Sequence, residues 1–264
     1  MGDRAAPLPV QPQAPYPATA DGSLPLPYRR SLDPLAVLAF VAAHTTRARI
    51  GSTIINLPFY NPVLLARNLA SIDVLSGGRL SVGFGLGWSP DEFEAVGVPM
   101  NDRGRRAEEA LKLIQAIWTE NPVEFRGRYC RLPKSYVDLK PVQKPRPPIY
   151  MAAYTRSAMA RVARLADGWN PTGVPAGAMG QMFGDIKRMA TDAGRDAGAL
   201  QMIVTANVEI HAEELGPGRM IFTGTPEQIE ADIAATRRLG AKESLYKPAC
   251  HDGSSERADQ ARLD

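Results

Sequence analysis

The sequence has few of the residues from which covalent cross-links and metal sites are built. Its 264 residues include two cysteines, Cys130 and Cys250, and three histidines. The cysteines form no Cys-x-x-Cys pair, and the histidines lack metal-ligand spacing. This scarcity argues against a disulfide scaffold and against a metal site. We therefore expect a protein of the reducing cytoplasm.

Long apolar runs and clustered charge are also lacking. No segment approaches the roughly 18 apolar residues that cross a bilayer, and the N-terminus lacks the apolar core of a signal peptide. The net charge is only +3, and the 31 Lys and Arg are scattered, whereas nucleic-acid-binding proteins usually carry a basic stripe. We expect a small-molecule ligand, and neither a membrane nor a nucleic acid as partner.

Proline, in contrast, is concentrated in residues 1–32, which contain Pro7, Pro9, Pro12, Pro15, Pro17, Pro25 and Pro27. Because proline fixes φ and removes a hydrogen-bond donor, this stretch is predicted to be an extended loop or a disordered arm. A mobile leader and a loop packed over a site both stay open.

Helix and strand signals alternate from Asp33 to residue 242. Asp33-Pro34 and Asn61-Pro62 each combine an N-cap with proline at the first helical position. Helices are expected over 35–45, 62–76, 107–118, 155–166, 179–186 and 226–239. Strands are expected over 48–56, 79–87, 149–154, 168–170 and 201–210, with a hairpin over 123–132. Such alternation predicts a parallel sheet with helices outside it.

The two faces of the strand over 201–210 favour a closed barrel over an open doubly wound sheet. Its apolar face comprises Met202, Val204, Ala206, Val208 and Ile210. Its other face carries Ile203, Thr205, Asn207 and Glu209. Strands of an open α/β sheet would more often be apolar on both faces. We predict an α/β fold with a TIM (β/α)8-type barrel over 33–242, followed by a polar tail over 243–264.

The strand over 79–87 has a face almost without side chains, formed by Ser81, Gly83, Gly85 and Gly87. Glycines inside a strand weaken it, so the presence of three glycines on this face needs an explanation. One interpretation is that a planar ring approaches the bare backbone. The alternative is that the glycines relieve crowding at a barrel bend. A Rossmann fingerprint is absent, because its third glycine would fall on Trp88 or Pro90.

Two groups of residues at carboxyl ends of strands are candidates for chemistry, because this architecture places its active site there. Glu92 follows Trp88 and is either a buried general acid or base, or a first-turn carboxylate that the helix dipole favours. Thr155, Arg156 and Ser157 begin a helix and offer hydroxyls, a cation and N–H groups to a phosphate. Serine and threonine are also ordinary helix caps.

Several motifs, taken together, resemble the bacterial-luciferase-like superfamily and, within it, an actinobacterial group of F420-dependent oxidoreductases. They are Asn61–Arg67, Leu75–Arg79, Gly83–Trp88 with Glu92-Phe93, Ala166–Asn170 and Gly224–Glu227. The resemblance runs from about residue 16 to residue 240. It implies a TIM-type barrel that binds coenzyme F420 or FMN and carries out hydride transfer or flavin monooxygenation.

The resemblance also implies positions for the cofactor. The strand that contains Gly51, Ser52 and Asn56 backs the ring. Gly85, Gly87 and Trp88 lie beside it, and Thr155, Arg156 and Ser157 receive the phosphate. An FMN enzyme would also need a flavin reductase as partner.

The chain departs from the family at both ends. Relatives have a strand, a helix and a second strand before the equivalent of Asp33, and an apolar last strand after the equivalent of Gly240. Here a proline-rich loop and the polar stretch Lys242–Pro248 stand in those places. We therefore expect an incomplete barrel of about five strands with a wet inner face, marginal alone or completed by a second copy as a homodimer.

Three functions stay open on this basis. The first is F420-dependent hydride transfer to or from a small organic substrate. The second is FMN-dependent monooxygenation, and the third is a degenerate barrel without catalysis.

Overall fold

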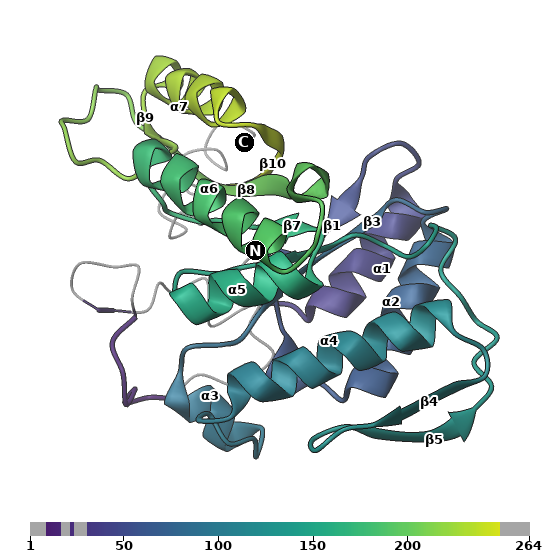
Figure 1. The fold of residues 1–264 in the computed structure, drawn as a ribbon. Helices are drawn as coiled ribbons and strands as arrows, with labels where there is room; N and C mark the ends of the chain where they lie inside the picture. Colours follow the sequence, from purple (N-terminus) through teal and green to yellow (C-terminus); the bar gives the residue numbers. More distant parts are fainter. Residues whose placement is uncertain (1–8, 17–21, 24–30, 249–264) are drawn as a thin grey trace, which may run out of the picture.

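A computed structural model describes residues 9–16, 22–23 and 31–248, the last six of these by their backbone alone. The chain forms a curled parallel sheet, a half-barrel, with helices packed along its outer side (Figure 1). The strand order is β1-β3-β6-β7-β8-β10, while β2 also pairs with β3 and β9 with β8. All of these pairings are parallel. The predicted α/β fold of TIM-barrel type is confirmed.

The sheet consists of β1 (Ile50–Gly51), β2 (Ile55–Asn56), β3 (Leu80–Gly85), β6 (Ile149–Met151), β7 (Gly168–Trp169), β8 (Gln201–Ile210), β9 (Thr223–Gly224) and β10 (Ala241–Pro248). The predicted hairpin is present as β4 (Val123–Arg126) and β5 (Arg131–Ser135), which pair antiparallel. The helices are α1 (Pro34–His44), α2 (Pro62–Leu75), α3 (Pro90–Ala95), α4 (Arg103–Thr119), α5 (Arg156–Leu165), α6 (Ala176–Asp192) and α7 (Pro226–Arg238), with short 3-10 turns η2 (Leu57–Phe59) and η3 (Ala197–Ala199).

Helix starts follow the caps that the sequence indicates. The Asp33 carboxylate accepts hydrogen bonds from the backbone N–H groups of Leu35 and Ala36, at 2.9 and 3.0 Å. Thr225 and Gln228 form a reciprocal capping box at the start of α7. These contacts satisfy N–H groups that have no partner inside a helix.

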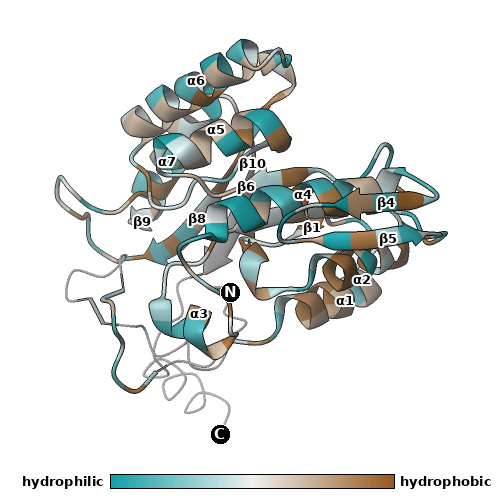
Figure 2. Ribbon diagram, turned by 60° about the horizontal axis from the view of Figure 1, so that its bottom comes forward, coloured by the Kyte–Doolittle hydropathy of each residue, from teal (hydrophilic) through white to brown (hydrophobic). Residues whose placement is uncertain are grey.

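The main core lies between the outer face of the sheet and the helices. The predicted apolar face of β8 is confirmed for Met202, Val204 and Ala206, which are fully buried in that core, whereas Val208 is partly buried and Ile210 is 63% exposed. Consecutive helices touch one another in the order α1, α2, α4, α5, α6 and α7, and so form one layer. Figure 2 shows apolar residues (brown) alternating with polar ones (teal) along these helices.

The strand expected over 48–56 is interrupted. β1 pairs Ile50 with Leu80, and β2 pairs Ile55 with Phe84. Five steps along one strand therefore match four along β3, so one extra residue bulges out between β1 and β2. The bulge is the segment 52–54, within which the Thr53–Ile54 peptide bond is cis.

The C-terminal prediction was partly wrong. Residues 243–248, assigned to a polar tail, belong to β10, which runs parallel to β8 from Ala241 opposite Met202 to Pro248 opposite Val208. The barrel strand expected to be missing after Gly240 is therefore present. This strand was not predicted from the sequence because its residues are polar. Hydrogen bonds between strands come from the backbone, and a strand with one described neighbour tolerates charged side chains. Residues 249–264 lie outside the described part.

The inner face of the sheet was expected to be exposed to water, but midway along the strands it is buried. Tyr150, Asn170 and Thr205 point inward and are 4, 1 and 2% exposed. The described residues of the N-terminal arm contain neither helix nor strand. That the family's first strands are missing stays a prediction.

Candidate functional site

Parallel strands bring their carboxyl ends to one edge of the half-barrel, here called the mouth. It is formed by Asn56 at the end of β2, Gly87 and Trp88 after β3, Thr155 to Ser157 after β6, and Glu209 near the end of β8. Most of these residues are ligand-binding candidates predicted from the sequence. The topology explains why residues as far apart in the sequence as Asn56 and Glu209 share one edge.

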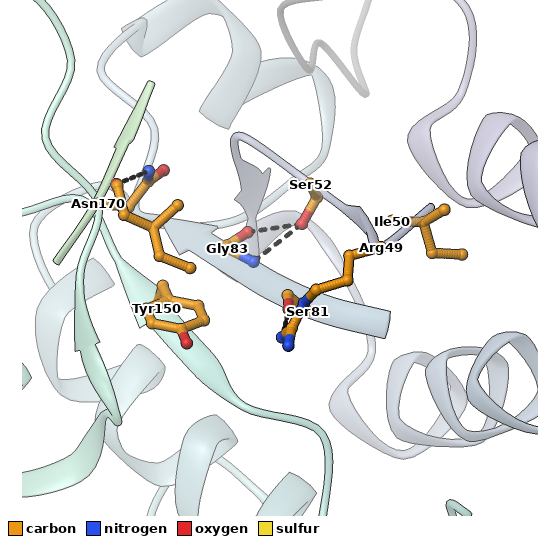
Figure 3. A pocket seen from close by; sticks show the side chains of 8 residues that line it. Arg49, Ile50, Ser52, Ser81, Gly83, Tyr150 and Asn170 are labelled. Atoms are coloured by element: carbon orange, nitrogen blue, oxygen red, sulfur yellow. Dashed lines mark hydrogen bonds between the residues drawn. The ribbon is translucent and has the colours of Figure 1, made fainter. Parts of the chain in front are cut away.

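The glycine face of β3 is filled by the chain itself. Ser52 Oγ donates a hydrogen bond to the Gly83 carbonyl and accepts one from the Gly83 N–H, both at 3.0 Å (Figure 3). A Cβ on Gly83 would overlap the Ser52 carbonyl oxygen, and a Cβ on Gly85 would overlap Ile54 Cδ1. The bulge at 52–54 thus presses against the glycines. The alternative interpretation, relief of crowding at a bend, explains Gly83 and Gly85.

The cavity in front of Gly83 is too small for a flavin ring. It is lined by Arg49, Ile50, Ser52, Ser81, Gly83, Tyr150, Asn170 and Ile203 (Figure 3), and its volume is about 10 Å³. That is room for about one water molecule. The expectation that a ring rests directly on the glycine face was therefore wrong. A ring at the mouth would meet the bulge and the loop after Gly85 instead.

That loop has a defined geometry. Gly87 has a φ of 76°, the left-handed region that favours glycine. A Cβ there would come within 3.0 Å of Phe59 and 3.1 Å of Phe93, whose rings pack edge to face. Gly87 thus turns the chain tightly against two aromatic rings, and Trp88 emerges half-buried at the mouth.

Glu92 lies in the first turn of α3 and is 1% exposed. Ser89 caps this helix by accepting a hydrogen bond from the Glu92 N–H at 3.4 Å. The carboxyl group is therefore inside the protein, and its catalytic role stays a prediction.

The phosphate candidates sit where the sequence places them, at the start of α5. Thr155 Oγ1 accepts a hydrogen bond from the Ala158 N–H at 3.3 Å and lies 3.2 Å from Ser157 Oγ. Thr155, Arg156 and Ser157 are all exposed, and the first turn carries no acidic residue. Arg156 also lines a groove with Asp185 and Arg188 of α6. This helix start suits an anion.

Sequence reasoning missed the polar pairs on the inner face and at the mouth. Asn170 Nδ2 donates to the Ile203 carbonyl at 2.6 Å and to Thr205 Oγ1 at 3.0 Å. Tyr150 donates to Gln201 Oε1 at 2.8 Å. Period-two alternation of polar residues in 201–210 was the available signal, but partners on other strands depend on the register between strands.

One such pair joins two mouth loops. The Tyr154 hydroxyl accepts a hydrogen bond from the Thr172 N–H at 3.2 Å and lies 3.5 Å from the Thr172 carbonyl. Tyr154 as a whole is 52% exposed, but the protein around its hydroxyl desolvates that group and raises its pKa, and the contacts with Thr172 lower the pKa by less. The loops after β6 and β7 are thereby fastened together.

Two further properties bear on the kind of site. Within residues 9–16, 22–23 and 31–248, no three His, Cys, Asp or Glu side chains gather as metal ligands would. No described helix combines the length and apolar character that crossing a membrane requires.

Comparisons with known proteins agree with this architecture. The family model for the luciferase-like monooxygenase domain matches residues 18–215. An uncharacterized protein of Mycobacterium tuberculosis is 37% identical over 246 residues, which cover 89% of this chain and 85% of that protein.

An FMNH2-dependent dimethylsulfone monooxygenase of Pseudomonas putida is 28% identical over 204 residues, or 75% of this chain and 56% of that enzyme. The structure of an F420-dependent secondary alcohol dehydrogenase superposes with a TM-score of 0.73 at 16% identity, covering 85% of this chain and 81% of that one. The family match spans most of the chain, and the chain therefore belongs to the luciferase-like monooxygenase family.

Proposed function

We propose that this protein is an F420-dependent oxidoreductase that transfers a hydride to or from a small organic substrate at the mouth. Family membership supports a flavin or deazaflavin enzyme, since the similar proteins include an FMNH2-dependent and an F420-dependent one. The choice of F420 over FMN depends on one observation, the solvent exposure of the residues around the mouth.

The described residues around the mouth are largely accessible. Tyr154, Thr155 and Ser157 are exposed, and Glu209 and His211 are partly exposed. An FMN monooxygenase must shield its oxygen intermediate from water, whereas hydride transfer makes no such demand on the pocket. An open mouth therefore favours deazaflavin chemistry over oxygen chemistry.

The residues at the mouth fit a planar cofactor with a phosphate. Ile54, Asn56 and Gly87-Trp88 would form the surface against which the ring lies. Thr155 and Ser157 would hold the phosphate through their hydroxyls and the N–H groups of the first turn of α5. The bound deazaflavin would supply the hydride acceptor or donor. Glu92, if it contacts the substrate from inside, would hold or release the proton.

The test is titration of the purified full chain with F420 and, separately, with FMN, followed by cofactor fluorescence. We expect F420 to bind more tightly. The deazaflavin chromophore without its phosphate-containing tail should bind more weakly, because the α5 start would lose its ligand. Tighter binding of FMN, together with oxygen consumption when a flavin reductase is added, would support the monooxygenase. A folded protein that binds neither would support a barrel without catalysis.

A further inference from the structure

The proline-rich arm contacts the loop that carries Trp88. The ring of Tyr16 lies 5.5 Å from that of Trp88, centre to centre, at an angle of 57°. This is the tilted arrangement that aromatic pairs favour. Tyr16 and Trp88 are both half-buried, so each ring also keeps an accessible part.

Gln13 fastens the arm beside this pair. Its backbone N–H donates to Asp91 Oδ2 at 3.0 Å, and its side-chain amide donates to Glu94 Oε2 at 3.1 Å. Both carboxylates belong to α3, the helix that follows Trp88, and Figure 1 shows this part of the arm beside α3. Hydrogen bonds to charged acceptors are stronger than neutral ones, so two of them define the position of a short segment.

A second contact shapes the segment itself. The Tyr16 N–H donates to the Gly22 carbonyl at 2.8 Å, and Gly22 has a φ of 70° with Pro15 directly against it. The backbone on both sides of Tyr16 is thereby held, at Gln13 and at Gly22. The position of Tyr16 against Trp88 thus follows from backbone contacts as well as from the rings.

We propose that Tyr16 is a binding residue of the mouth: with Trp88 it forms an aromatic wall for the flat ring of the cofactor, and Gln13 is the residue that positions it. This inference rests on the proposed function. A planar ring beside Trp88 gains aromatic contact from Tyr16, and the proline-rich arm presents that side chain with little loss of chain entropy. Residues 13–16 of the arm are then part of the site.

The first experiment tests the contact without any cofactor. Trp118 and Trp169 are fully buried, so Trp88 is the tryptophan of this chain that a soluble quencher reaches most easily. Acrylamide quenching of tryptophan fluorescence should increase in Tyr16→Ala and in Gln13→Ala. It should stay unchanged in Tyr136→Ala, a matched control at an exposed tyrosine that follows the β4–β5 hairpin. Unchanged quenching in Tyr16→Ala would overturn the proposal.

The second experiment measures the dissociation constant of F420, and of FMN, by titration. Tyr16→Ala should weaken binding about 2- to 10-fold, which corresponds to an aromatic contact. Tyr16→Phe keeps the ring and should bind like the wild type. Gln13→Glu places a carboxylate against Asp91 and Glu94 and should weaken binding as Tyr16→Ala does.

The outcomes separate the two proposals. If the wild type binds a cofactor and Tyr16→Ala binds it equally well, the aromatic wall is refuted and the proposed function stands. If the folded wild type binds neither cofactor, both fail.

Discussion

Ile54 occupies the space that Gly85 leaves open. A Cβ on Gly85 would overlap Ile54 Cδ1, because the bulge between β1 and β2 turns the Ile54 side chain toward β3. The glycine is thus required by a neighbouring strand, independently of any cofactor.

Replacing Gly85 by alanine should therefore destabilise the protein. Overpacking a core by one methyl group costs about 1–3 kcal/mol of the free energy of unfolding, measured by urea denaturation. Ile54→Val removes Cδ1, so the double variant should recover part of the loss. Gly177→Ala is the control: apart from the adjacent backbone of α6 itself, nothing lies within 4 Å of the place a Cβ would take, and the change should be neutral or slightly stabilising. A neutral Gly85→Ala would contradict the packing described here.

Glu109 should make stability depend on pH. Burial alone would raise the pKa of its carboxyl, but the N–H groups of Tyr129, Arg128 and Cys130 outweigh that effect and hold the pKa below its ordinary value of 4.5. A lowered pKa in the folded state stabilises the protein above the unfolded value, and this contribution is lost as pH falls through the folded value.

We expect Glu109→Gln to be less stable than the wild type at pH 7, by on the order of 1 kcal/mol. The difference should shrink as the pH falls below about 4.5. Urea denaturation at several pH values measures it, with Glu124→Gln, an exposed partner of Arg126, as the control. A difference that did not vary with pH would rule out the carboxylate as its source.

Ser157→Asp should separate phosphate binding from helix stability. A negative charge in the first turn of α5 is favourable to the helix, so thermal stability should be kept or slightly raised. The same charge repels a phosphate, so affinity for F420 should fall about 10-fold or more. Ser157→Ala, which removes only the hydroxyl, should show a smaller loss. Equal affinity in the aspartate variant would place the phosphate elsewhere.

The outer surface of α1 and α2 is expected to carry a homodimer interface. Phe40 on α1 and Leu64 on α2 are 64% and 62% exposed, and α1 is apolar on nearly all sides. Exposed apolar faces of this kind are typical of interfaces. Sedimentation should show a dimer for the wild type and a monomer for Phe40→Asp or Leu64→Asp. Tyr136→Asp, at another exposed aromatic, should leave the dimer intact. A clean monomer with a cooperative thermal melt would refute this expectation.

The order of elements and the type of fold follow from local features of the chain. Asp33 and Pro34 favour the start of a helix independently of the tertiary structure, because the cap and the proline act within one helical turn. The alternating apolar residues of 201–210 similarly predict which side of β8 is buried. The family motifs are also short and local, which is why the sequence alone indicated the family and the mouth residues Trp88, Thr155 and Ser157.

The tertiary structure decided three further features. These are the contacts of the glycine face, the polar pairs inside the half-barrel and the pairing of the last strand. Ser52 and Gly83 are 31 residues apart, and their contact depends on the register of two strands and on one extra residue in a bulge. β10 forms through backbone hydrogen bonds to β8 despite its polar side chains. Such contacts join distant segments, and a one-residue shift in register would change them all, so no local pattern encodes them.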